Sequence, residues 1–200
     1  MEDEKFSEQD SLRLIAGMIN QAKNYYYESG LGCLLWGFTN FICFTLTYLG
    51  DTVKGFHLPF NPFYLMGITL IVQVYYDRKE EKFKTAKSYL DEVHKYVWTA
   101  FGICVLILTI VGAIAKIGYI VLPLLLLFFG LPTFISGCIN KFKPFIIGGV
   151  FCWILSIIAF LYQTEESLLL VAAGTGVAWI IPGFILRARF ATNRKKQHGI

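Results

Sequence analysis

Six long runs of apolar residues are the feature that most limits what this chain can fold into. None of the six contains an aspartate, glutamate, lysine, arginine or histidine. Each has the length of roughly 17 to 25 residues that a transmembrane α-helix needs. They cover residues 31–49, 60–76, 97–115, 119–139, 144–162 and 168–186. We therefore predict an all-α integral membrane protein, a bundle of six transmembrane helices in one domain that covers residues 1–200.

Composition argues against a soluble globule of this size. Hydrophobic residues make up 56% of the chain and charged residues only 16%, so polar side chains are too few to cover a globular surface. A formal net charge of +4 could indicate nucleic-acid binding, but the bases lie in short segments between apolar runs, as in membrane proteins. We therefore expect the lipid bilayer, and no nucleic acid, as a partner.

The distribution of lysine and arginine predicts the side of the membrane that each segment occupies. Residues 1–30, 77–96, 140–143 and 187–200 hold 16 of the 18 basic residues. The connections on the other side hold only Lys54 and Lys116. Because short cytoplasmic loops are enriched in lysine and arginine, we predict a multi-pass protein of the cell inner membrane with both termini in the cytoplasm.

Two of these cytoplasmic segments, residues 1–30 and 77–96, have the periodicity of amphipathic helices, and the second is expected to continue into the run that follows it. Such helices can lie on the membrane surface or pack on the protein's own loops, and they can also dock a soluble partner. The predicted docking face consists of Leu12, Ile15, Ile19, Phe83 and Leu90. The segment 187–200 is expected to be a basic cytoplasmic tail.

A threefold pattern runs through the apolar segments. Every odd run contains a tryptophan and every even run a glycine or proline, namely Trp36, Gly67, Trp98, Pro132, Trp153 and Pro182. This pattern is consistent with three helical hairpins in tandem. The alternative is that tryptophan and basic residues recur at the membrane interface of any multi-span protein.

The apolar runs contain no grouping of ionisable or nucleophilic side chains, so we expect no enzyme, no metal site and no cofactor. The five cysteines lie within apolar runs without a CxxC pair, and the three histidines are far apart. Polar residues and prolines within the runs could hold helices together or kink them, or could line a cavity or form a hinge. The candidate cavity or hinge residues are Asn40, Pro132, Thr133, Ser136, Thr175 and Pro182.

Residues 11–38, SLRLIAGMINQAKNYYYESGLGCLLWGF, resemble the opening of a family of small multi-spanning bacterial inner-membrane proteins with an amphipathic N-terminal helix. The resemblance extends loosely over the whole chain and brings no activity with it. Members of this family are sometimes encoded beside small winged-helix regulators, so the resemblance implies a cytoplasmic regulatory protein as a partner.

These observations favour a non-enzymatic sensor or anchor module that engages a cytoplasmic partner through its amphipathic helices. The alternative is a small transporter or channel for a neutral or apolar solute, with a path beside the prolines of the fourth and sixth runs. A third possibility, an enzyme acting on lipid at the interface, has no catalytic grouping to support it.

Overall fold

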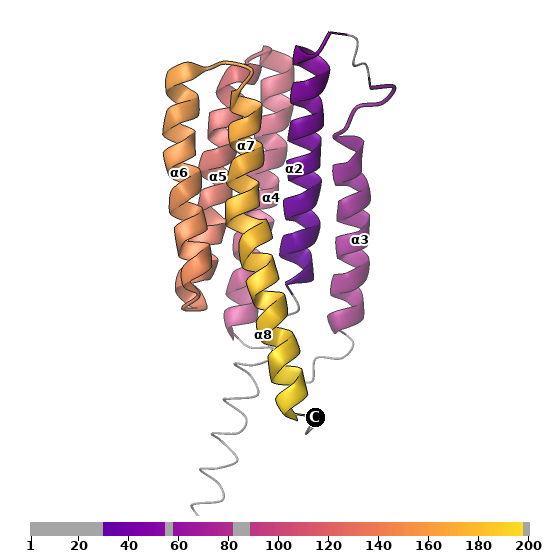
Figure 1. The fold of residues 1–200 in the computed structure, drawn as a ribbon, viewed down its shortest axis with the longest axis vertical. Coiled ribbons are helices and arrows are strands. Elements are labelled where there is room, and N and C mark those ends of the chain that lie inside the picture. The colour runs from indigo at the N-terminus through magenta and orange to yellow at the C-terminus, as the bar shows by residue number, and fades with distance from the viewer. Residues whose placement is uncertain (1–29, 55–57, 82–88, 198–200) are drawn as a thin grey trace, which may run out of the picture.

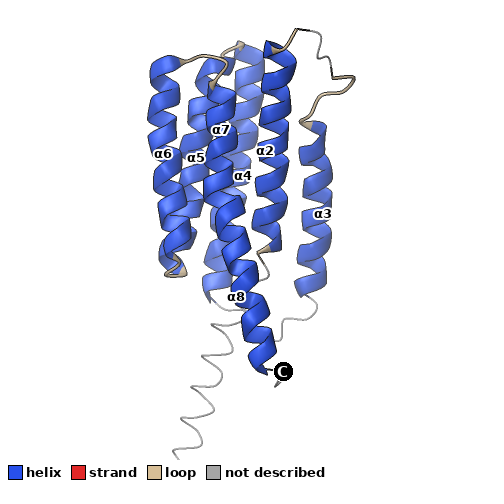
Figure 2. Ribbon diagram, viewed as in Figure 1, coloured by secondary structure: helices blue, strands red, loops and turns tan. Residues whose placement is uncertain are grey.

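The computed structural model describes residues 30–54, 58–81 and 89–197, and within them every regular element is helical (Figures 1 and 2). The all-α prediction is therefore confirmed. The elements are α2 (Leu31–Thr52), α3 (Tyr64–Glu81), α4 (Tyr89–Ala115), α5 (Gly118–Ile139), α6 (Lys143–Tyr162), α7 (Ser167–Thr175), a π-helix η1 (Gly176–Ile180) and α8 (Ile181–Gln197). The last three follow one another without a break, and we call them the C-terminal rod.

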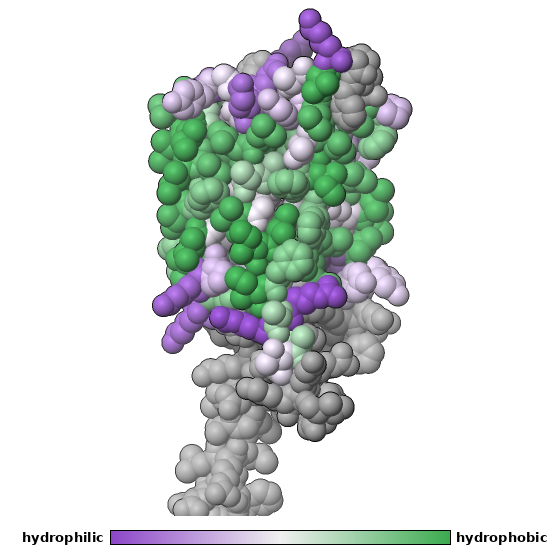
Figure 3. All heavy atoms as spheres, viewed as in Figure 1, coloured by the Kyte–Doolittle hydropathy of each residue, from purple (hydrophilic) through white to green (hydrophobic). Residues whose placement is uncertain are grey.

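Five helical stretches are long and apolar enough to cross a membrane: Leu31–Thr52, Glu92–Ala115, Ile120–Ile139, Lys143–Tyr162 and Ser167–Arg189. They lie side by side with roughly parallel axes (Figure 1). Their exposed side chains form an apolar band with hydrophilic residues at both edges (Figure 3). This arrangement is compatible with a multi-pass membrane bundle, and among the described residues it confirms five of the six predicted apolar helices and leaves the sixth span unconfirmed.

Helix α3 is the predicted span that falls outside this set. It begins at Tyr64 instead of residue 60, because the chain before it forms a turn in which the Asn61 side chain accepts a hydrogen bond from the Phe63 N–H at 3.0 Å. It ends in the charged sequence DRKEE, residues 77–81. The helix therefore has only 13 residues before its first charge, about 20 Å at 1.5 Å per residue.

The connections between α4, α5, α6 and the C-terminal rod are short. A residue in the left-handed region stands at each of them, with φ of 56° at Lys116, 50° at Lys141 and 41° at Gln163. Such a residue ends a helix by turning the chain out of the helical path. Short turns of this kind make consecutive helices antiparallel neighbours.

The closest packing in the bundle is between α5 and α6. A Cβ atom added at Gly149 would lie 2.9 Å from the carbonyl oxygen of Gly130, so the two backbones touch where both residues lack side chains. Because α5 and α6 belong to different predicted hairpins, the packing gives no support to three equivalent hairpins, and the tandem repeat is not confirmed.

The remaining helices pack around this pair. The C-terminal rod packs against α2, α5 and α6, while α4 packs mainly on α5 and α3 mainly on α2. The main buried core includes Phe44, Leu126, Phe129, Val171 and Trp179. Side chains of α4 are largely exposed on the apolar band, as expected for a helix at the lipid-facing edge of a bundle. The basic tail continues the rod as helix to Gln197.

Candidate functional site

Aromatic and polar side chains from three helices meet near the end of the bundle where α4 begins. The rings of Trp98 on α4 and Trp179 on η1 lie 6.1 Å apart between centroids. Phe129 on α5 lies 4.9 Å from Trp179, and Phe101 on α4 lies 5.8 Å from Phe129. Together with three hydrogen-bonded neighbours these residues form what we call the tryptophan cluster: His94, Trp98, Phe101, Phe129, Thr133, Ser136 and Trp179.

Two buried hydroxyl groups of α5 organise this cluster. The Trp179 indole Nε1–H donates to Thr133 Oγ1 at 2.8 Å, and Thr133 Oγ1 donates to the Phe129 carbonyl at 2.7 Å. The Trp98 Nε1–H donates to Ser136 Oγ at 3.3 Å. Both hydroxyls lie on one face of α5, three residues apart, so α5 accepts an indole N–H from each of its two neighbours.

His94 adds the titratable group of the cluster. Its Nδ1 atom lies 3.3 Å from Ser136 Oγ, within hydrogen-bonding distance, and its ring lies 5.8 Å from that of Trp98. The spacing of four residues between His94 and Trp98 places both on one face of α4. Ser136 therefore contacts α4 through two side chains at once.

Trp179 lies within the π-helix η1. The Ile181 N–H donates to the Gly176 carbonyl, five residues back instead of four, so the rod widens by one residue at this point. Pro182 follows directly, and its ring would clash with the carbonyl of residue 178 in a regular α-helix. π-helical turns of this kind occur frequently at functional sites.

The other predicted cavity or hinge residues have separate places in the fold. The Asn40 side chain is buried and donates to the Trp36 carbonyl of its own helix at 2.8 Å. Thr175 is buried and donates to the Ala172 carbonyl at 2.9 Å, again within its own helix. Pro132 lies inside α5, which continues through it. The structure thus brings Thr133 and Ser136 into one cluster and leaves Asn40 and Thr175 bonded locally.

The predicted docking face can be placed only in small part. Leu12, Ile15, Ile19 and Phe83 lie outside the described residues. Leu90 is in the first turn of α4, where the backbone is described and the side chain is not.

Sequence reasoning missed Trp179, Phe129 and the role of His94. Trp179 carried a usable signal, since an indole N–H within an apolar run needs an acceptor and finds one when buried. For His94 the signal was its position four residues before Trp98 in a segment already expected to be helical. Phe129 carried no signal that separates it from the other phenylalanines.

The cluster consists of hydrogen bonds and ring contacts. Among the described residues no group of three histidine, cysteine or acidic side chains could hold a metal ion. What the cluster can do is couple the position of α4 to that of α5 and the C-terminal rod.

At the opposite end of the bundle, a hydrogen bond with the Thr164 side chain lowers the pKa of the exposed Glu166 carboxyl.

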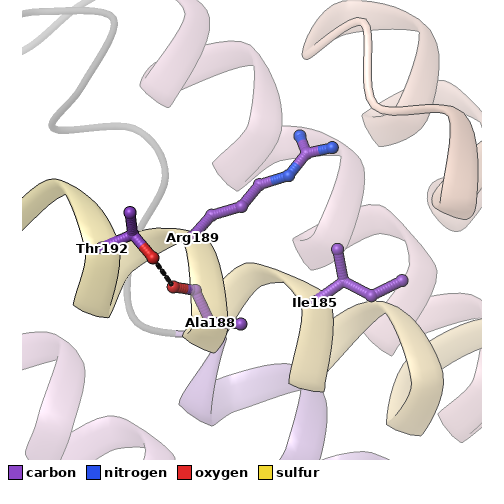
Figure 4. A pocket seen from close by; sticks show the side chains of 4 residues that line it. All are labelled: Ile185, Ala188, Arg189 and Thr192. Carbon is purple, nitrogen blue, oxygen red and sulfur yellow. Dashed lines mark hydrogen bonds between the residues drawn. The ribbon is translucent and has the colours of Figure 1, made fainter.

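A second feature lies on α8, outside the cluster. A shallow hollow of about 410 Å³ is lined by Ile185, Ala188, Arg189 and Thr192 (Figure 4). The guanidinium carbon of Arg189 lies 5.1 Å from the centroid of the Phe142 ring, in the connection between α5 and α6. The hollow therefore lies beside the connection between the end of α5 and the start of α6, which also carries lysines.

Comparison of the chain with protein-family models, with curated proteins and with solved structures finds no match.

Proposed function

We propose that this chain is a six-span protein of the bacterial inner membrane that acts as a non-enzymatic sensor or anchor module for a cytoplasmic regulatory protein. The observation that carries the proposal is the charge difference between the two ends of the bundle. Exposed bases at the end where α8 projects are Arg78, Lys95, Lys141, Lys143, Arg187 and Arg189. The other end has Lys54 and Lys116 together with Asp51, Glu165 and Glu166. By the positive-inside rule the first end is cytoplasmic.

A sixth span is supported by the contact between α3 and α2. The hydroxyl groups of Thr69 and Thr39 lie 2.8 Å apart, and Thr69 is buried although its helix is otherwise largely exposed. Hydrogen bonds of this kind hold membrane helices together. With α3 as a span, all the basic segments lie on one side of the membrane.

The sensor role is supported by the course of α4. This helix runs from Tyr89 to Ala115 without a break, so it connects the charged cytoplasmic segment to the apolar band. Near the beginning of α4, the side chains of His94 and Trp98 lie within hydrogen-bonding distance of Ser136 on α5. A displacement of its cytoplasmic end therefore acts on the tryptophan cluster, and through Trp179 on the rod that ends in α8.

The geometry favours this role over a carrier for a neutral or apolar solute. The hydroxyls expected to line such a path belong to Thr133, Ser136 and Thr175, whose side chains are at most 1% exposed. Each is occupied by a hydrogen bond to another side chain or to a backbone carbonyl. A solute path through them would have to break these bonds.

Site-specific photocrosslinking in the native host tests the proposal. A crosslinker at Leu12 or Leu90 should capture one soluble protein, for which a winged-helix regulator is our candidate, and Ile15→Ser with Ile19→Ser should abolish the adduct. The same crosslinker at Lys54 or Lys116 is the control at the opposite membrane face. Identical adducts from both faces, or no adduct with a soluble protein from Leu12 and Leu90, would remove the proposal.

A further inference from the structure

The hollow on α8 has a regular order of side chains along the helix axis. Ile181, Ile185 and Arg189 follow one another at intervals of four residues, so they form one stripe that leads from the apolar band to a charged end. Ile181 is 53% exposed. The side chains of Ile185 and Arg189 project from the same side of α8 (Figure 4). The stripe thus offers apolar surface and a cation to the same molecule.

The exposed guanidinium group at the end of this stripe has an aromatic neighbour. It lies over the ring of Phe142, which is 1% exposed and packs with Phe145 and Leu186 in a small core of its own. Ile185 packs against the same core. A guanidinium that stacks on an aromatic ring retains N–H groups that can bind a phosphate with two parallel hydrogen bonds.

Two further cations flank the phenylalanine that Arg189 contacts. Lys141 and Lys143 flank Phe142 in the chain and are both exposed, and Lys143 is the first residue of α6, where the helix dipole adds partial positive charge. Neither the connection between α5 and α6 nor the α8 sequence contains an acidic residue. Hydrophilic side chains gather along this edge of the apolar band (Figure 3).

We infer that this hollow binds the phosphate-bearing headgroup of an anionic membrane lipid, with Arg189 contacting the phosphate and Ile185 and Ile181 contacting the acyl chain. Basic sites on the cytoplasmic side of membrane proteins bind such headgroups, and here α8 lines the hollow while the connection between α5 and α6 adds Lys141 and Lys143. A free phosphate would use the cations but leave the apolar half of the stripe without a partner. The inference depends on the proposed membrane placement but not on the proposed regulatory partner.

Native mass spectrometry of the full-length protein in detergent provides the test. Phosphatidylglycerol and phosphatidylethanolamine with the same acyl chains are supplied in turn. We expect phosphatidylglycerol to be retained preferentially and Arg189→Gln to reduce its binding about tenfold, as for the loss of a charge-assisted contact. Lys116→Gln, which removes the same charge at the other end of the bundle, should leave binding unchanged. Equal retention of the two lipids, or equal loss in the two variants, would overturn the inference.

Two further arms separate the source of the phosphate and protect against a folding defect. Millimolar inorganic phosphate or glycerol 3-phosphate should fail to displace the lipid, and displacement would show that the site takes free phosphate instead. The pair Lys141→Gln and Lys143→Gln should also weaken phosphatidylglycerol binding, and Ile185→Ser should do so without a change in charge. These two variants test the assignment even if the Arg189→Gln protein does not accumulate in cells. The assignment fails if neither of them weakens phosphatidylglycerol binding. Because the readout is lipid retention by the purified protein, its failure is distinct from the absence of a crosslinked regulator.

Discussion

The Thr133 hydroxyl is both a hydrogen-bond donor and an acceptor inside the bundle. It accepts from the Trp179 indole at 2.8 Å and donates to the Phe129 carbonyl at 2.7 Å, and the residue is 1% exposed. In a buried apolar interior, an indole N–H that loses its acceptor has no water to replace it. The Trp179–Thr133 bond should therefore contribute measurably to the stability of the folded bundle.

A double-mutant cycle measures that contribution. Trp179→Phe removes the N–H and keeps most of the ring, and Thr133→Val removes the acceptor with little change in shape. We expect a coupling free energy of about 0.6 to 2 kcal/mol from unfolding in SDS titrations, the range found for hydrogen bonds between membrane helices. The cycle of Trp179→Phe with Thr109→Val, whose hydroxyl bonds its own helix on α4, should show no coupling. A coupling near zero for the first pair would mean that the bond adds nothing to stability.

At the scale of single residues, the sequence predicted candidates better than it predicted their partners. Asn40, Thr133, Ser136 and Thr175 stood out because each is polar within an apolar run. Which of them would bond another helix was beyond the sequence, because a helical hydroxyl or amide can reach a carbonyl of its own preceding turn. Asn40 and Thr175 bond in that way, whereas Thr133 and Ser136 bond tryptophans from neighbouring helices.

Among the elements, the α5–α6 pair depends on glycine. A Cβ atom added at Gly149 would lie 2.8 Å from Phe134 Cβ and 2.9 Å from the Gly130 carbonyl oxygen, and backbone atoms cannot give way as a flexible side chain can. Van der Waals contact between closely approaching backbones is a principal source of helix association in membranes. Added volume at this contact must separate the two helices.

Gly149→Ala should therefore destabilise the bundle by about 1 to 3 kcal/mol, the usual cost of overpacking. Gly102→Ala is the matched control, because a Cβ atom there would have no atom within 4 Å in α4. The control should be neutral or stabilising by roughly 0.5 to 1 kcal/mol from helix propensity. SDS unfolding curves of the two variants give the comparison. Equal effects of the two substitutions would show that the α5–α6 contact is not tight.

The elements also show where sequence reasoning ends. Apolar length and the absence of charge located five of the long helices, because these properties alone decide whether a helix can cross a bilayer. The π-helix Gly176–Ile180 was not predicted, since widening a helix by one residue leaves composition and length unchanged. Trp179 lies within this π-helix, so the regular helical spacing of the sequence did not predict its contact with Thr133.

At the scale of the whole molecule, α3 decides the topology of everything that follows it. If α3 crosses the membrane, Lys54 and Lys116 lie on one side, and the other basic segments lie together on the opposite side. If α3 stays at one surface, each later segment changes sides, so Lys141 and Lys143 leave the side that holds the N-terminal segment. The short apolar length of α3 argues against a span, and the one-sided distribution of lysine and arginine argues for it. The charge pattern is the stronger argument because it involves every connection in the chain.

Labelling of single cysteines with a membrane-impermeant maleimide tests this directly. In a background in which the five native cysteines are replaced, Lys54→Cys, Lys116→Cys and Glu165→Cys should react in intact cells. Lys141→Cys should react only after the membrane is permeabilised. Without a crossing by α3, Lys54→Cys and Lys116→Cys must label from opposite sides, because α4 alone then separates the two faces. If Lys54→Cys and Lys116→Cys label from the same side, α3 crosses the membrane. If they label from opposite sides, the protein has five spans, and its N-terminal and C-terminal segments lie on opposite faces.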